Sequence, residues 1–271
     1  MKNLMIYISP EGAFKTTGFH ENFDLKEIDE SEVIEKVAIE NSLAMGWKPE
    51  DIVLVTNFPY EYMGIKALEV GNENFCEHSP TASKILAMIT LIEKGIIGDE
   101  LWWFHDWDAF QLEEITEEEV ALEDNQLGLT DYGVSNVNPG RSKWWSTGSM
   151  FLKQGCLDIL KEIMGEADKY QCNEEMALLE MLKKRRYQRF KPRIVKMNIT
   201  YNLATRRRDI RKAYEKADKP LKVIHFHPFD WRPTSEGGNN MEVCIEGKNW
   251  LGKPLVTSTL IKLFKKHGII L

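Results

Sequence analysis

The first 110 residues alternate short apolar runs with segments of helical periodicity. The apolar runs cover residues 4–8, 51–57 and 100–105, and apolar side chains recur at helical spacing over 29–46 and 79–95. A glycine closes each helical segment, as is common at helix ends. This alternation predicts a βαβαβ unit, and the near-continuous third strand fits a parallel sheet covered on both faces.

The pattern is less regular after residue 110. We expect an acidic helix over 112–123, turns over 132–141, a strand over 147–153, helices over 156–163 and 174–184, a basic helix over 205–216, a strand over 221–226 and a terminal helix over 257–267. No internal repeat and no linker rich in Gly, Pro or Ser divides the chain. The sequence therefore predicts one α/β domain over 1–271, with a boundary between its two halves near residue 110.

The composition is that of a folded globular protein. The chain has 271 residues, of which 43% are hydrophobic and 28% charged. It holds no uncharged apolar stretch of about 20 residues and no secretory signal pattern, so we expect a cytoplasmic protein without a membrane span. Four cysteines stand far apart, which predicts reduced, mostly buried thiols: Cys76, Cys156, Cys172 and Cys244.

Charge is distributed unevenly along the chain. The net charge is −7, but residues 1–135 hold 8 Lys and Arg against 28 Asp and Glu, whereas residues 136–271 hold 27 against 14. A solvated helix surface explains any single run of charge. Segregation on this scale favours an anionic ligand, phosphate or nucleic acid, on the C-terminal half.

Two pairs of candidate metal ligands follow predicted strands. Asp106 and Asp108 stand two residues apart, so in extended backbone they point the same way, at the edge of an α/β sheet where ligands bind. A solvated turn is the alternative. His225 and His227 have the same spacing at the end of the late strand, and a core histidine is the alternative for either. Carboxylates with an imidazole suit Mn²⁺ or Mg²⁺, and Mn²⁺ matches the nitrogen better.

The order of these elements and motifs resembles the nucleotide-sugar-dependent glycosyltransferases of the GT-A fold, distantly those of the glycogenin type. The resemblance rests on the Asp106-Trp107-Asp108 motif after a strand, the Thr147-Gly148 strand and the late His225. It implies a Rossmann-type, mostly parallel sheet with flanking helices, in which 1–110 bind the nucleotide and 111–271 bind the acceptor and complete the metal site.

The resemblance also assigns roles to the motif residues. Asp106 and Asp108 would hold a metal that bridges the diphosphate of a donor such as a UDP-sugar, with His225, rather than His227, as third ligand. The donor-binding residues that we expect, from the resemblance together with the available charge, are Ser9, Lys84, Asp106, Trp107, Thr147, Gly148 and Lys222. The chain has His225-Phe226-His227-Pro228 where glycogenin-type members have His-x-x-Gly-x-x-Lys-Pro-Trp.

Sugar transfer requires charge stabilisation at the leaving group and, in an inverting enzyme, a base for the acceptor hydroxyl. Candidate cations for the diphosphate are Lys84, Arg141, Lys143 and Lys222. Glu174 or Glu175 could act as the base, since both follow the cap-like Asn173. Acidic residues in a first helical turn also interact favourably with the helix dipole, which is the alternative role for both.

The acceptor is open on the sequence alone. Trp144 and Trp145 would offer a flat platform for a sugar or a base if exposed, and core packing is equally consistent with them. A glycosyltransferase acting on nucleic acid is a second hypothesis, because Arg207, Arg208 and Arg211 could track a phosphate backbone. A third is a non-catalytic module that binds nucleic acid or protein and carries an accidental Asp-x-Asp.

Overall fold

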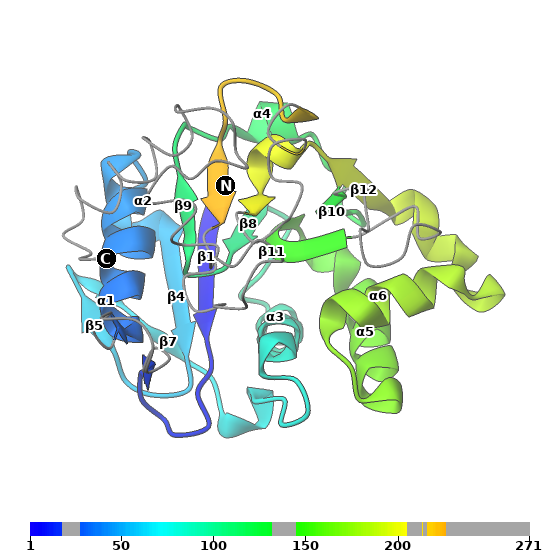
Figure 1. Cartoon of the computed structure of the whole chain (residues 1–271), viewed down its shortest axis with the longest axis horizontal. Helices are drawn as coiled ribbons and strands as arrows, with labels where there is room; N and C mark the ends of the chain where they lie inside the picture. The colour runs from blue at the N-terminus through cyan, green and yellow to red at the C-terminus, as the bar shows by residue number, and fades with distance from the viewer. Residues whose placement is uncertain (18–27, 132–144, 205–212, 214–215, 226–271) are drawn as a thin grey trace, which may run out of the picture.

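A seven-stranded sheet forms the centre of the computed structural model, which describes residues 1–17, 28–131, 145–204, 213 and 216–225 (Figure 1). Its strand order is β12-β10-β11-β8-β1-β4-β7. In that order the strands span Ile194–Met197, Leu127–Asp131, Trp145–Leu152, Trp102–His105, Lys2–Tyr7, Ile52–Thr56 and Leu68–Glu69. Strand β1 pairs in parallel with β4 and β8, whereas β11 is antiparallel to both of its neighbours, so the sheet is mixed and mostly parallel.

The predicted βαβαβ unit is confirmed. The first helical segment joins α1 (Glu30–Val33), a π-helix (Ile34–Ile39) and α2 (Glu40–Ala44) without a break. The second is α3 (Ser83–Glu93), which follows a 3-10 turn, Pro80–Ala82. Gly46 and Gly95 lie just beyond these helices with φ of 91° and 70°, backbone angles that glycine adopts without strain.

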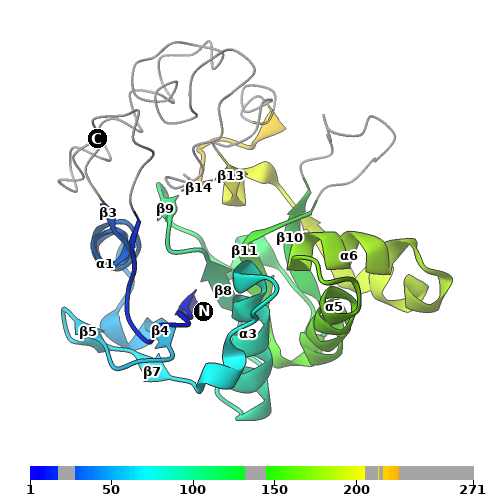
Figure 2. The ribbon, with the colours of Figure 1, turned by 60° about the horizontal axis from the view of Figure 1, so that its bottom comes forward.

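Both faces of the sheet are covered, which explains why its central strands are apolar throughout. Successive side chains of a strand point to opposite faces. Leu4 and Ile6 of β1 pack in the core shared with α3 and α5, whereas Met5 and Tyr7 pack against the helical segment 30–44. Figure 2 shows α1 and α3 on opposite sides of β1 and β4.

The second half adds two long helices and a small sheet. Helices α5 (Leu157–Tyr170) and α6 (Glu174–Lys183) pack against each other beside β11. The small sheet has the order β13-β14-β9, with bounds Leu203–Ala204, Val223–His225 and Ala109–Gln111. Asn41 of α2 braces β9: its Nδ2 donates to the Gln111 carbonyl at 3.0 Å, and its Oδ1 accepts from the Gln111 N–H at 2.8 Å.

The remaining elements are short. The strands are β2 (Thr16–Thr17), β3 (Ile28–Asp29), β5 (Glu61–Tyr62) and β6 (Ile65–Lys66). The 3-10 helices are Pro49–Asp51, Asn72–Asn74, Gln154–Cys156, Arg185–Arg193 and Ile199–Tyr201. Within the described ranges, every helix is too short or too polar to cross a bilayer.

The predicted acidic helix over 112–123 is wrong in extent, since only α4 (Glu117–Val120) is helical. Tertiary pairing is the reason: Phe110 faces Ile224 across the β9–β14 ladder, and the Leu112 N–H donates to the Lys222 carbonyl at 2.7 Å. Leu112 therefore extends the pairing of β9 with the chain beside β14, and no helix begins there. The helices expected over 205–216 and 257–267 fall mainly or wholly outside the described residues.

Candidate functional site

Two strands of different sheets bring an acidic pair and a histidine together. Asp106 directly follows β8, and its N–H donates to the Gly148 carbonyl of β11 at 2.9 Å. His225 of β14 lies opposite Ala109, just beyond the pair. Its Nε2 is 2.9 Å from Asp108 Oδ1 and 3.6 Å from Asp106 Oδ2. The structure thus joins three of the four predicted ligands, while His227 lies outside the described residues.

The donor set of this cluster fits a divalent cation. Each residue offers one ligand atom, and the three atoms lie within 4.8 Å of one another. Two carboxylate oxygens with one imidazole nitrogen suit Mn²⁺ and, with more bound water, Mg²⁺. All three side chains are at least three-quarters buried, so packing limits their movement and an ion bound here would have rigidly held ligands.

Lys84 adds a buried positive charge to the cluster. Its Nζ lies 3.0 and 3.2 Å from the two oxygens of Asp106 and 3.3 Å from Glu174 Oε1. Burial by itself lowers the pKa of the Lys84 amine, but Asp106 and Glu174 more than offset this and raise it. Lys84 is therefore an ammonium in the folded protein.

Glu174 is the residue that holds Lys84 from the other side. It begins α6, and its oxygens accept from the hydroxyls of Thr81 and Thr147, each at 2.9 Å. Burial raises the pKa of Glu174, yet Lys84 and these hydrogen bonds bring it below its usual value. Because both of its oxygens are engaged, the contacts favour a positioning role. Glu175 Oε1 accepts from the Thr147 N–H at 3.1 Å.

Gly148 allows His225 to reach the acidic pair. A Cβ at this position would lie 2.3 Å from His225 Cε1, 2.4 Å from its Nδ1 and 3.1 Å from Asp106 Oδ2. Contacts that short do not occur, so any side chain here would displace the imidazole. The Thr147-Gly148 pair therefore supplies both a hydroxyl for Glu174 and space for the histidine.

The histidines of the site have opposite titration behaviour. Burial lowers the pKa of His225, but Asp108 and Asp106 reverse this and raise it. His105, at the end of β8, is also buried, and burial lowers its pKa to about 4. Its ring packs at a tilt against Trp103, and its Nδ1 lies 3.0 Å from the Asp106 carbonyl, so a neutral His105 can fix the backbone at Asp106. Sequence reasoning missed His105, although it stands directly before the Asp-x-Asp motif.

Three other predicted site residues have partners outside this cluster. Ser9 is buried beyond β1, where its N–H donates to Asn57 Oδ1 at 2.9 Å. The Trp107 ring packs edge-on near Tyr7 with centroids 5.9 Å apart. The structure does not bring Lys222 to the cluster, because its amine lies 3.1 Å from Glu119 on α4.

Of the two alternatives for Trp145, an exposed platform and core packing, the structure supports core packing. Trp145 begins β11 and is 5% exposed, with its indole in the core that includes α6. Strand pairing with Asp131 carries it inward. The other predicted residues without a described position are Arg141, Lys143, Trp144, Arg207, Arg208 and Arg211.

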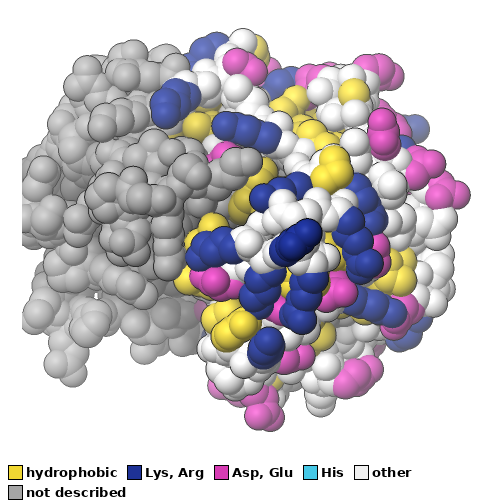
Figure 3. Space-filling model, turned by 90° about the vertical axis from the view of Figure 1, so that its right-hand side faces the viewer, with side chains coloured by type: hydrophobic (Ala, Val, Ile, Leu, Met, Phe, Trp, Pro, Cys, Tyr) yellow, Lys and Arg dark blue, Asp and Glu magenta, His cyan; other side chains and the backbone are white. Residues whose placement is uncertain are grey.

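The basic character of the second half is visible on the surface. Lys and Arg side chains gather on the face shown in Figure 3, which carries α6 and the 3-10 helix Arg185–Arg193. Several of these cations are paired within the chain: Lys184 and Arg186 contact the buried Glu166, and Arg193 lies 2.6 Å from Asp158.

No family model and no curated protein matches this sequence. Solved structures do match. An active-site mutant of LgtC aligns at 12% identity and a TM-score of 0.55, covering 98% of this chain and 96% of that one. The galactosyltransferase LgtC in complex with donor and acceptor sugar analogs aligns at 13% identity and 0.53, covering 89% and 93%. The glycosyltransferase GlyE of Streptococcus pneumoniae TIGR4 aligns at 14% and 0.52, covering 99% and 64%. At this level of identity the likeness concerns architecture, and the chain has the GT-A fold of these glycosyltransferases.

Proposed function

We propose that this protein is a glycosyltransferase that moves a sugar from a nucleotide-sugar donor to a hydroxyl acceptor. The observation that carries the proposal is the meeting of Asp106, Asp108, His225 and Lys84 beyond the carboxyl end of β8. Ligands of open α/β sheets bind at that edge. The GT-A fold and the donor and acceptor sugar analogs bound to LgtC support a sugar-nucleotide substrate, for which a UDP-sugar is the first candidate.

We assign the divalent ion, Mn²⁺ or Mg²⁺, to Asp106, Asp108 and His225. Such an ion supplies Lewis-acid stabilisation of the negative charge that a diphosphate leaving group gains. Charged residues of the chain itself also stabilise the negative charge on the leaving group. Lys84 holds Asp106 in place and contributes a second positive charge, and Glu174 keeps Lys84 ionised and oriented.

The acceptor hydroxyl requires a group that takes its proton if the reaction inverts configuration. Of the two glutamates that begin α6, Glu175 is the better candidate, because Glu174 is buried with both oxygens held by Thr81, Thr147 and Lys84, whereas Glu175 is only half-buried. We propose Ser9, Trp107, Thr147 and Gly148 as further donor-site residues. We also treat 1–271 as one domain, which the alignment of almost the full chain with LgtC supports.

Substitution Asp108→Asn tests the assignment. It removes one carboxylate ligand without changing size, so we expect at least a tenfold loss of Mn²⁺ affinity and of sugar release from UDP-sugars, with an unchanged circular dichroism spectrum. A thermal-shift panel of nucleoside diphosphates with and without Mn²⁺ gives a second readout, because a ligand that binds the native state raises apparent stability.

The matched control is Asp124→Asn, whose exposed carboxylate pairs with Lys153 at the surface. It should behave as the parent in both assays. If the Asp108→Asn variant transfers sugar at the wild-type rate, Asp108 is not a ligand of the proposed metal site. Metal-independent nucleotide binding by the parent would argue against the metal assignment as a whole.

A further inference from the structure

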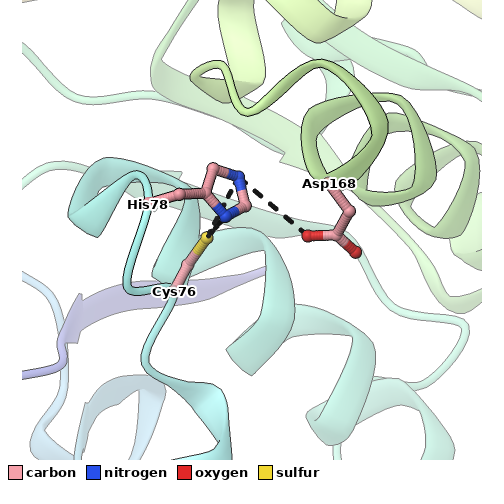
Figure 4. Close-up of side chains that lie close together, drawn as sticks. All are labelled: Cys76, His78 and Asp168. Atoms are coloured by element: carbon pink, nitrogen blue, oxygen red, sulfur yellow. Dashed lines mark hydrogen bonds and ion pairs between the residues drawn. The ribbon is translucent and has the colours of Figure 1, made fainter.

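A second group of metal-ligating side chains lies outside the proposed active site. Cys76 and His78 belong to the segment that leads into α3, and Asp168 lies near the end of α5 (Figure 4). The Cys76 Sγ is 3.5 Å from His78 Nδ1 and 3.6 Å from its Nε2. His78 Nε2 is in turn 4.0 Å from Asp168 Oδ1. The sulfur is thus almost equidistant from the two ring nitrogens, and Nε2 is the one for which a contact with Asp168 is also seen.

These separations are close to those of a tetrahedral zinc site. Zinc binds thiolate sulfur at about 2.3 Å and imidazole nitrogen at about 2.0–2.1 Å, so two such ligands at a tetrahedral angle stand about 3.5 Å apart. The Sγ–Nε2 separation of 3.6 Å matches this edge. The Asp168 oxygen is about half an ångström too distant, but its side chain is 65% exposed and can rotate toward the imidazole.

We propose that Cys76, His78 and Asp168 bind a Zn²⁺ ion, with water at the fourth position. The mixed set of sulfur, nitrogen and oxygen selects a borderline-soft ion rather than Mg²⁺ or Ca²⁺. On binding, the Cys76 thiol becomes the thiolate ligand and its proton passes to solvent. This site differs in chemistry from the cluster at Asp106, which contains no sulfur.

Zinc binding would hold two helix ends in a fixed position relative to each other. The Cys76 N–H donates to Ser83 Oγ at 2.9 Å, and Ser83 begins the helix whose next residue is Lys84. An ion shared with Asp168 would join the start of α3 to the end of α5. Zinc would therefore restrain the helix end that presents Lys84, without contacting the donor site.

Cobalt substitution provides the test, because Co²⁺ bound to a thiolate shows a sulfur-to-metal charge-transfer absorption that carboxylate and imidazole ligands cannot produce. Titration of the reduced full-length chain with Co²⁺ should produce this band with one ion per chain, and Zn²⁺ should displace it. The readout requires no sugar substrate, so its outcome is independent of the proposed activity.

Three variants locate the ion. Cys76→Ser should abolish the band, and Asp168→Asn, a change at an exposed side chain, should retain it with at least a tenfold weaker affinity. Cys172→Ser is the control, since this half-buried thiol is four residues from Asp168 and outside the cluster. Absence of a band at saturating Co²⁺, a band that survives in Cys76→Ser, or a band lost in Cys172→Ser overturns the proposal. A band in Asp168→Asn at the parent's affinity overturns the role of Asp168.

Discussion

Gly148 is the residue of the proposed active site that tolerates a larger side chain least. Because a Cβ there would overlap the imidazole of His225, Gly148→Ala should displace the histidine from Asp106 and Asp108. Overpacking of this kind costs about 1–3 kcal/mol of unfolding free energy. We expect that loss in urea denaturation, together with a loss of Mn²⁺ affinity in calorimetry.

Gly165→Ala is the control for Gly148→Ala. Gly165 lies inside α5, and a Cβ at this position meets no atom within 4 Å. Gly165→Ala should therefore stabilise the protein by about 0.5–1 kcal/mol through helix propensity, and leave Mn²⁺ binding unchanged. Parent-like metal binding by Gly148→Ala would mean that the placement of His225 does not depend on this glycine.

At the scale of elements, a buried charge network joins α3, α6 and the end of β8. Lys84 contributes the cation, and Asp106 and Glu174 the anions. Glu174→Gln should lower the unfolding free energy by about 1–3 kcal/mol near pH 7, since a buried ammonium loses one of its two carboxylate partners. It should also lower sugar transfer, because Lys84 is held less firmly.

The pH dependence of stability checks the same network. The pKa of Glu174 is lowered in the folded protein, so its contribution is present above the usual value of 4.5 and is lost as pH falls through the folded pKa. Glu174→Gln should therefore flatten the acid limb of a stability profile measured from about pH 7 to about pH 3. Glu93→Gln, which removes an exposed pair with Lys161, should change stability by only about 0–1 kcal/mol. An unchanged acid limb in Glu174→Gln would show that another group controls it.

Elements with strong local patterns are the ones that the sequence predicts well. The three apolar strands and the helices that become α3 and α6 appear within a few residues of their expected positions, whereas α5 begins as expected but ends seven residues later. The acidic segment 112–123 fails at its start because Leu112 continues the chain of β9 and donates to the carbonyl of Lys222, which lies next to β14 and more than 100 residues away in the sequence. Propensity carries no information on such a contact.

In the proposed active site, too, local sequence patterns predict some residues, whereas others depend on tertiary contacts. The Asp-x-Asp spacing indicates where Asp106 and Asp108 lie, but the Lys84–Glu174 contact depends on how α3 docks against β1 and how α6 docks against β11. Trp145 and Lys222 depend on tertiary neighbours in the same way, and their predicted roles are the ones that the structure does not support.

At the scale of the whole molecule, the uneven charge distribution is partly neutralised by internal pairing. Lys184 and Arg186 share Glu166, Arg193 pairs with Asp158, and Lys183 with Glu180. We therefore expect no measurable binding of duplex DNA at physiological salt. Fluorescence anisotropy with a labelled duplex checks this, because phosphate binding weakens steeply as salt rises.

A triple variant with alanine at Arg207, Arg208 and Arg211, which lie outside the described residues, extends that experiment. If the parent does bind DNA and the triple variant shows a shallower salt dependence with unchanged donor hydrolysis, nucleic acid becomes the favoured acceptor. Binding by neither protein at low salt would exclude it and leave the basic residues as solvated surface.

Because the segment Ile34–Ile39 is a π-helix, the number of residues in it determines which way the following helix α2 faces. Each hydrogen bond of the π-helix closes around one residue more than an α-helical bond does. A relative with one residue fewer in this segment would continue as a plain α-helix and turn Asn41 by about 100°. Asn41 would then leave Gln111, and β9 would lose the brace beside the strand that carries His225. Insertions and deletions here should therefore be as rare among relatives as substitutions of the histidine, although the segment lies almost 200 residues earlier in the chain.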